Sequence, residues 1–283
     1  MTKLAESYQH CQQFAANHYE NFPVASRLLP VSIRPAVAVL YTFARTADDI
    51  ADEGELTAEQ RLEGLDELQN RLDAMLFGRP SSDLIFNALS DVVERYRISH
   101  RLLNDLLGAF RQDVSKNRYA DEAELLDYCR RSANPVGQAM LCLVSESRPQ
   151  LLEQSDAICT ALQLINFLQD VSQDYHEMGR IYIPQDEMAR FAVDEQQIAH
   201  AETTDTTRAL FNYQLDRIER LLVKGSPLGS QLNGRFGLEI RAIIAGAQLI
   251  VKKLRRQRDC FARPRLSRLE KFGLLWRALF RLA

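Results

Sequence analysis

Apolar residues recur at helical spacing through most of the chain, and this periodicity constrains the fold more than any other feature. Val37, Leu40, Ala44 and Ala47 form one such stripe, and Gly54 ends it. No alternating run of β-branched residues bounded by hairpin turns indicates a strand. The sequence therefore predicts an all-α fold. The expected helices cover residues 36–52, 57–77, 82–96, 99–113, 121–147, 151–177, 204–224 and 235–258.

The composition is that of a globular protein with a substantial core. The chain has 283 residues, of which 46% are hydrophobic and 26% are charged, and no linker-like segment interrupts it, so a single domain over 1–283 is expected. Five scattered cysteines lack metal or disulfide spacing and indicate reduced thiols in a cytoplasmic protein. No apolar run reaches the roughly 18 residues that a transmembrane helix needs.

The C-terminal segment differs from the rest in charge. From Lys252 onward, 11 lysine and arginine residues stand against only Asp259 and Glu270, although the whole chain has a net charge of -3. The last stretch, 272–283, interleaves aromatic and aliphatic residues with arginines. Such a tail either lies on an anionic membrane surface at the inner face of the cytoplasmic membrane or docks on the protein body. Binding of nucleic acid is not expected, because the body is acidic.

Two clusters of carboxylates carry the chemical signal. Asp48 and Asp52 are four residues apart, as are Asp170 and Asp174, so each pair projects from one helix face. Both pairs lie near the predicted C-terminus of a helix, where the helix dipole and mutual repulsion disfavour carboxylates. A divalent cation removes both penalties, and Mg²⁺ takes one or two protein carboxylates together with water and phosphate oxygens.

A single pair of this kind would more often be part of a solvated helix face. Here both pairs emerge from apolar segments: Phe43 and Ala47 precede the first, and Phe167 and Leu168 precede the second. A solvated helix face accounts poorly for two pairs of carboxylates that both follow apolar segments. The pattern therefore predicts that a phosphorylated ligand, bridged by cations, is held between two acidic helices.

These motifs resemble those of the squalene/phytoene synthase family over nearly the whole chain. The acidic motifs read DDIADE from Asp48 and DVSQD from Asp170. Further segments match in order, including 18–22, the tyrosine signature from Tyr128 to Gly137 and the loop 179–184. The resemblance implies an isoprenoid synthase bundle of helices around an apolar cavity, with two or three Mg²⁺ ions and a prenyl diphosphate substrate.

The resemblance also implies roles for individual residues. It implies that one set of residues binds the metal ions and that a second set binds the diphosphate. A tyrosine would stabilise a carbocation or relay a proton. The C-terminal half matches less well, because 245–248 lacks the tyrosine that relatives often carry, and Arg263 could equally be a surface charge. The metal ligands implied are Asp48, Asp52, Asn166, Asp170 and Asp174; the substrate-binding residues are His18, Arg45, Gln163, Arg180 and Arg263; the catalytic residues are Tyr128, Asn134 and Gln169.

Two departures indicate the branch of the family. Gln169 stands where many relatives have arginine, and Asn134-Pro135 replaces a small turn that contains glycine. This combination resembles the bacterial branch of hopanoid pathways that ionises presqualene diphosphate and captures the rearranged cation with water. Gln169 or Asn134 would then position that water, and NADPH is not expected. The alternatives are condensation of two farnesyl diphosphates to presqualene diphosphate or another C30 product, and a non-enzymatic helical partner protein.

Overall fold

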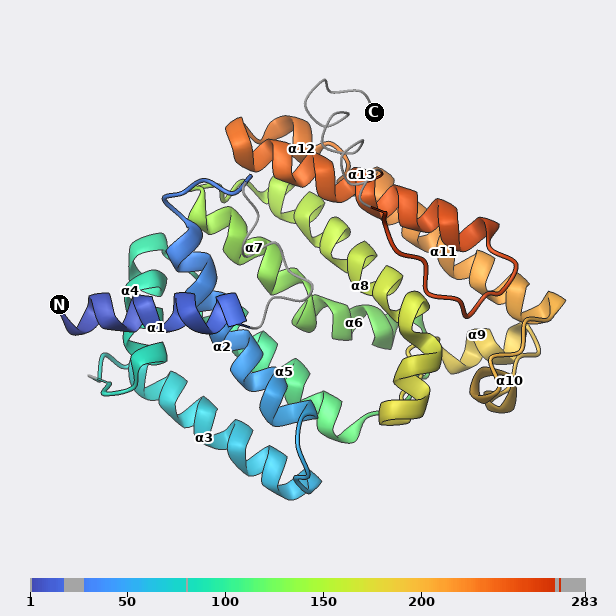
Figure 1. Ribbon diagram of the computed structural model, residues 1–283, viewed down its shortest axis with the longest axis horizontal. Coiled ribbons are helices and arrows are strands. Elements are labelled where there is room, and N and C mark those ends of the chain that lie inside the picture. The colour runs from blue at the N-terminus through green and yellow to red at the C-terminus, as the bar shows by residue number, and fades with distance from the viewer. Residues whose placement is uncertain (1, 18–27, 80, 268–269, 271–283) are drawn as a thin grey trace. The chain divides into compact units, whose positions relative to one another are not determined.

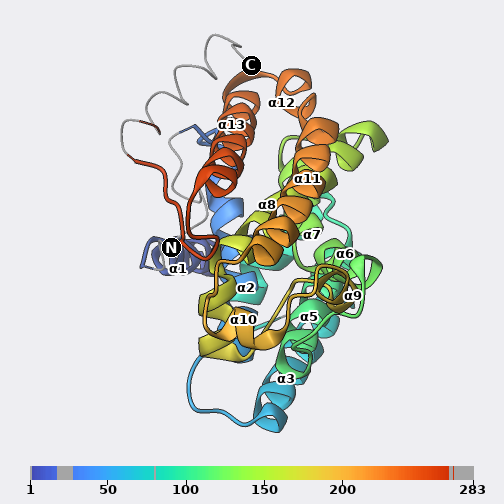
Figure 2. The same ribbon diagram turned by 90° about the vertical axis from the view of Figure 1, so that its right-hand side faces the viewer.

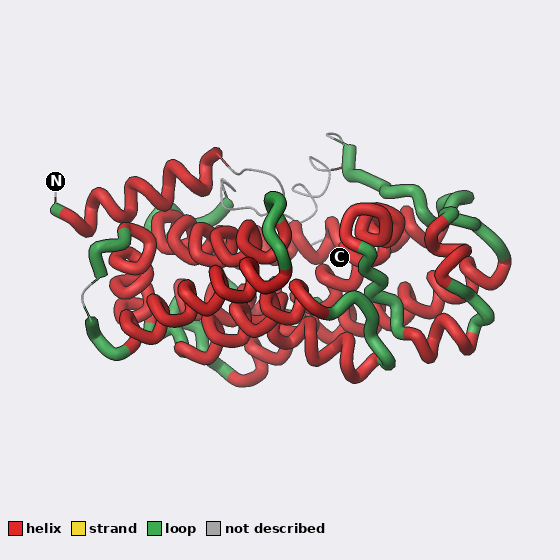
Figure 3. Tube along the Cα trace, turned by 90° about the horizontal axis from the view of Figure 1, so that it is seen from below, coloured by secondary structure: helices red, strands yellow, loops and turns green. Residues whose placement is uncertain are grey.

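A computed structural model describes residues 2–17, 28–79, 81–267 and 270. All regular structure within these residues is helical, as the secondary-structure colouring in Figure 3 shows, so the predicted all-α fold is confirmed. The chain divides into two compact units, one made of Met1–Ser115 with Pro135–Arg148 and the other of Lys116–Asn134 with Pro149–Ala283. The expectation of a single domain stays a prediction.

The first unit is built around α2 (Arg34–Asp52), which contacts four neighbouring helices (Figure 1). Its buried face includes Phe43, whose ring meets that of Phe86 edge-on at 6.2 Å between centroids. The neighbours are α1 (Lys3–Asn17), α3 (Ala58–Leu76), α4 (Leu84–Tyr96) and α5 (His100–Ser115), and most of α7 (Asn134–Leu143) completes the unit.

The second unit is organised by the 30-residue helix α8 (Pro149–Met178). Figure 2 shows α11 and α13 running beside it, and both contact it. Because α8 has buried residues along most of its length, the acidic residues near its end emerge from a packed helix. The other helices are α6 (Glu122–Ser132), α9 (Gln185–Arg190), α10 (Glu195–Ala199), α11 (Asp205–Gly225), α12 (Leu228–Gln231) and α13 (Gly234–Arg256).

Local sequence signals account for several helix ends. Thr57 caps α3 with a reciprocal capping box, and Gly54 and Gly78 adopt left-handed φ angles of 75° and 72° after α2 and α3. The prediction of one helix over 121–147 is wrong. The structure has α6 and α7 instead, with Pro135 in the first turn of α7, where its missing N–H costs nothing.

Four helices were not predicted, namely α1, α9, α10 and α12. Helix α1 buries only small residues, Ser7, Cys11 and Ala15, which produce a weak apolar stripe, and the other three are at most six residues long. No helix in the described part of the chain combines the length and apolar character needed to cross a membrane.

Candidate active site

The first acidic cluster lies at the C-terminal end of α2 and surrounds Arg45. The Arg45 guanidinium lies 3.1 Å from the Asp48 carboxylate and 2.5 Å from the Asp49 carboxylate, and it also pairs with Glu53. Asp52 belongs to the same turn and raises the pKa of Asp48 by its charge. The structure therefore brings together Arg45, Asp48 and Asp52, as predicted from their spacing.

The charge in this cluster is not balanced. Burial raises the pKa of the Asp48 carboxyl to about 6; the Arg45 cation opposes the shift, and the neighbouring carboxylates of Asp52, Asp49 and Glu53 add to it. One guanidinium thus faces several carboxylates, and the ionised state of Asp48 is disfavoured. A bound cation would restore that state.

A cavity of about 550 Å³ in the same unit is lined by residues of this cluster. Its α2 wall changes character along the helix, from apolar at Val37 and Leu40 to charged at Arg45 and Asp48. The opposite walls come from α5 and α7 and are apolar, with Leu106 among them. A cavity of this size and polarity suits a ligand with a long apolar tail and an anionic, cation-bound head.

The second acidic cluster lies near the C-terminus of α8. Asp170 is 7% exposed, and both of its carboxylate oxygens meet Arg263, at 2.5 Å from Nε and 3.0 Å from Nη2. Burial raises the pKa of Asp170 despite the Arg263 cation, and burial followed by the Asp170 charge raises the pKa of Asp174 to about 7. Arg180 is buried and lowers the pKa of Asp174 by its charge.

Three further predicted residues lie on α8, and Asn134 is the first residue of α7. Asn166 is exposed on α8 one turn before Asp170, and Gln163 is half-buried one turn earlier. Gln169 donates from Nε2 to the Pro264 carbonyl at 2.7 Å, and the buried Asn134 accepts from the Thr160 hydroxyl at 2.9 Å. His18 and the tail 272–283 lie outside the described residues, so their predicted roles stay predictions.

Tyr128 belongs to a buried group of four aromatic rings. Phe167 stacks on Tyr182 with 3.7 Å between ring centroids, Tyr128 lies 5.9 Å from Tyr182, and Tyr119 lies 5.5 Å from Tyr128. The sequence did not predict a role for Phe167, Tyr182 or Tyr119. Only sequence position could have indicated a role: Phe167 follows Asn166 directly, and Tyr182 lies in the matched loop 179–184.

A buried ion-pair group ties the segments that carry these rings to α11. Arg217, with 3% of its side chain exposed, contacts Glu122 at 2.8 Å from both Nε and Nη2, and it pairs with Glu187. Gln214 accepts from Arg217 at 2.9 Å and donates to Glu187. Glu122 begins α6, which carries Tyr128.

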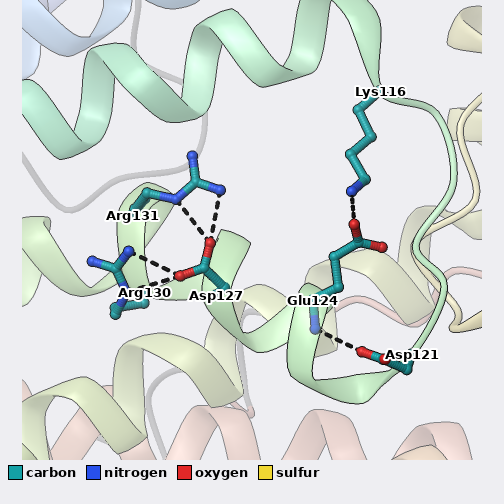
Figure 4. A network of polar contacts seen from close by, with 6 residues as sticks. All are labelled: Lys116, Asp121, Glu124, Asp127, Arg130 and Arg131. Atoms are coloured by element: carbon teal, nitrogen blue, oxygen red, sulfur yellow. Dashed lines mark hydrogen bonds and ion pairs between the residues drawn. The ribbon is translucent and has the colours of Figure 1, made fainter.

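Surface ion pairs fasten α6 further (Figure 4). Asp121 caps its N-terminus by accepting from the backbone N–H of Glu124 at 2.9 Å, and the Glu124 carboxylate pairs with Lys116. One turn before the end of α6, Asp127 pairs with both Arg130 and Arg131. The Lys116 pair therefore fastens the N-terminal end of the helix that presents Tyr128, whereas the Asp127 pairs lie within α6 itself.

The residues fit a divalent cation that takes only some of its ligands from the protein and the others from phosphate oxygens and water. Among the described residues, no three carboxylate, imidazole or thiolate groups converge as a complete metal site. The donors present are pairs of carboxylates, and in each pair one member, Asp48 or Asp174, has an ionised form that is disfavoured by burial and by neighbouring carboxylates. Such pairs match the preference of Mg²⁺ for one or two protein carboxylates, with its other ligands from water and phosphate.

The raised pKa of Asp174 has a consequence for stability. Because the folded state holds this proton more tightly than the unfolded state, the carboxyl favours folding at low pH, and that contribution is lost as pH rises from about 4 to 7. Asp174→Asn is therefore expected to raise the melting temperature of the metal-free protein at pH 8 by about 2–4 °C, since solvent screening limits the gain to ~1 kcal/mol.

Thermal melts of both proteins in EDTA at pH 5 and pH 8 check this prediction. At pH 5 the difference between the two melting temperatures should be less than half of that at pH 8. Adding Mg²⁺ with inorganic diphosphate at pH 8 should reverse the order, because only the wild type has the carboxylate that a cation needs. An equal difference at both pH values would contradict the prediction.

The comparisons with known proteins agree with this geometry. The profile of the squalene/phytoene synthase family matches residues 15–270. The chain is 36% identical to hydroxysqualene synthase of Zymomonas mobilis over 90% of this chain and 85% of that protein. It is also 36% identical to hydroxysqualene synthase of Rhodopseudomonas palustris, over 89% of this chain and 85% of that protein.

Solved structures show the same fold. Squalene synthase HpnC from Alicyclobacillus acidocaldarius superposes with a TM-score of 0.84 at 30% identity, covering 91% of this chain and 96% of that one. A dehydrosqualene synthase in complex with a ligand also gives a TM-score of 0.84, at 24% identity over 99% of this chain and 98% of that chain.

Proposed function

The chain belongs to the squalene/phytoene synthase family, and we propose that it is a hydroxysqualene synthase. It is an enzyme that acts on prenyl diphosphates. The proposed reaction converts presqualene diphosphate and water to hydroxysqualene and diphosphate. The family profile spans residues of both compact units, which supports the proposal that 1–283 works as one domain.

The observation that carries the proposal is the cavity of about 550 Å³. Its lining combines the Arg45 and Asp48 side chains with apolar walls from α2, α5 and α7. This polarity matches an isoprenoid diphosphate, which has a hydrocarbon tail and a highly charged head. The apolar walls would also keep water away from a carbocation until the rearrangement is complete.

We assign the ionisation step to the charged residues. Asp48, Asp52, Asp170, Asp174 and Asn166 would hold the cations, and bound Mg²⁺ supplies neutralisation of the leaving diphosphate. The substrate oxygens would be bound by His18, Arg45, Gln163, Arg180 and Arg263, with guanidinium groups well suited to phosphate oxygens.

The capture step is assigned to Tyr128, Asn134 and Gln169. Tyr128 lies among stacked rings whose faces would stabilise a cation, and its hydroxyl would relay the proton released by the attacking water. The Asn134 carbonyl oxygen is already occupied by the Thr160 hydroxyl, so its amide nitrogen is the end that would bind the water. Gln169 is the second candidate for that role.

Condensation of two farnesyl diphosphates is the second candidate function. It is favoured by the likeness to a structure described as a squalene synthase, at 30% identity over 91% of this chain. Both reactions need the same charged residues, because both begin with loss of diphosphate. The charged residues therefore do not separate the two functions, and product analysis does.

The test incubates the purified protein and Mg²⁺ with presqualene diphosphate and, separately, with farnesyl diphosphate, each with and without NADPH. We expect an alcohol from presqualene diphosphate that is independent of NADPH. Presqualene diphosphate formed from farnesyl diphosphate would establish the second candidate instead. A folded sample that releases no diphosphate from either substrate would overturn both and favour a non-enzymatic role.

A further inference from the structure

A segment that follows α13, residues 257–267, is fastened to the second unit along its length, and we call it the C-terminal strap. Arg208 of α11 donates from Nη1 to the Gln257 carbonyl at 3.0 Å, and within the strap the Gln257 side chain donates to the carbonyl oxygens of Cys260 and Ala262, each at 3.0 Å. The backbone N–H of Cys260 donates to Thr203 Oγ1 at 2.9 Å, and Lys253 Nζ donates to the Arg265 carbonyl at 2.9 Å. Its contacts on both sides of residue 263 restrict where Arg263 can reach.

At its centre, two consecutive strap residues meet two consecutive residues of α8. Gln169 donates to the Pro264 carbonyl at 2.7 Å, and the neighbouring Asp170 pairs with Arg263 through both carboxylate oxygens. Gln173, one turn later, lies 3.4 Å from the Arg263 guanidinium. The Gln169 contact thus attaches the strap backbone to α8 at the residue that follows Arg263.

We propose that Gln169 is a positioning residue that holds the strap so that the Arg263 guanidinium stays at the Asp170 cluster, where the diphosphate binds. The inference rests on the proposed function. A chain segment loses conformational freedom when it is ordered, so anchoring the backbone beside Arg263 beforehand lowers the cost of binding an anion.

A neutral amide suits this task better than a charged group. Gln169 donates to the Pro264 carbonyl without adding a charge beside Arg263 and Asp170. A carboxylate at 169 could not donate and would repel the carbonyl oxygen, and an aliphatic group would leave that oxygen without this donor. The side chain at this position therefore determines whether the strap is attached.

The test compares Gln169→Leu and Gln169→Glu with the wild type, and with Gln248→Leu, an exposed glutamine of α13, as the matched control. Hydrogen exchange of backbone amides in 257–267 reports attachment of the strap. Calorimetry with Mg²⁺ and inorganic diphosphate reports anion binding. Turnover of presqualene diphosphate gives kcat, KM and the product distribution.

We expect faster exchange in the strap and about fivefold weaker diphosphate binding for both Gln169 variants, the size of one net hydrogen bond. KM should rise with an unchanged product distribution, and Gln248→Leu should match the wild type. Unchanged exchange or unchanged diphosphate affinity in Gln169→Leu overturns the inference. A changed product distribution at unchanged affinity also overturns it and favours the role in positioning water.

The wild type separates failure of this inference from failure of the proposed function. If the wild type neither binds Mg²⁺ with diphosphate nor releases diphosphate from a prenyl substrate, the proposed function fails. If the wild type does both and the Gln169 variants match it, only the positioning role fails.

Discussion

Asp48→Asn and Asp170→Asn are each expected to lower kcat/KM for presqualene diphosphate by about 100- to 1,000-fold, the range found when one preorganised electrostatic group is removed. The reason is the loss of one anionic ligand from the proposed site, which would hold cations against a leaving diphosphate. The measurement is the rate of Mg²⁺-dependent diphosphate release, with circular dichroism to show that each variant is folded.

A matched control is Asp66→Asn, which removes an exposed carboxylate that pairs with Arg111 in the first unit. Because an exposed ion pair contributes little, this variant should stay within about twofold of the wild type. A loss of similar size in Asp66→Asn would show that the effect is structural and not specific to the acidic clusters.

The double variant Asp48→Asn/Asp170→Asn tests whether both clusters act on one diphosphate. Groups that act as a unit show strongly non-additive effects, so the double variant should lose little more than either single variant. Losses that multiply would mean that the clusters act independently, and would contradict a shared diphosphate.

The second large effect is expected for Arg217→Met, which should lower the free energy of unfolding by about 3–5 kcal/mol. The substitution leaves the Glu187 carboxylate, with 6% of its side chain exposed, without the cation that compensates its burial. Glu122, with 44% exposed, can turn to solvent and should add little to the cost. Urea unfolding followed by circular dichroism measures the change.

Arg255→Met is the matched control for this prediction. Arg255 also bridges two carboxylates, Asp216 and Glu219, but all three side chains are at least 33% exposed. Its removal should therefore cost less than about 1 kcal/mol. Replacing Glu187, Gln214 and Arg217 together by Met, Leu and Met should recover most of the lost stability, because no buried charge remains unpaired. A triple variant as unstable as Arg217→Met would contradict the explanation.

Most helices could be predicted because their signals are local. Pro35 and Gly54 mark the ends of α2, and Thr57 with Gln60 forms the box that starts α3. The break between α6 and α7 was missed, because Pro135 is compatible with both a helix start and a disruption inside a longer helix. Helix α1 was missed because its buried face is made of small residues.

The candidate site was predictable where its residues are neighbours in sequence. Arg45, Asp48 and Asp52 share one helix face by spacing alone, and the structure places them together. The contact of Gln169 with Pro264 spans 95 residues, and that of Arg263 with Asp170 spans 93. No periodicity or motif reports such pairs.

The all-α fold and the two acidic helix ends follow from the sequence, because helical spacing converts residue types directly into faces, and the motifs indicate the family by resemblance. Which charges Arg217 and Arg263 neutralise, and the place of Tyr128 in a group of four rings, depend on tertiary contacts. The physical reason is that burial and long-range packing set the local dielectric and the partners of a side chain, and both depend on segments distant in the chain.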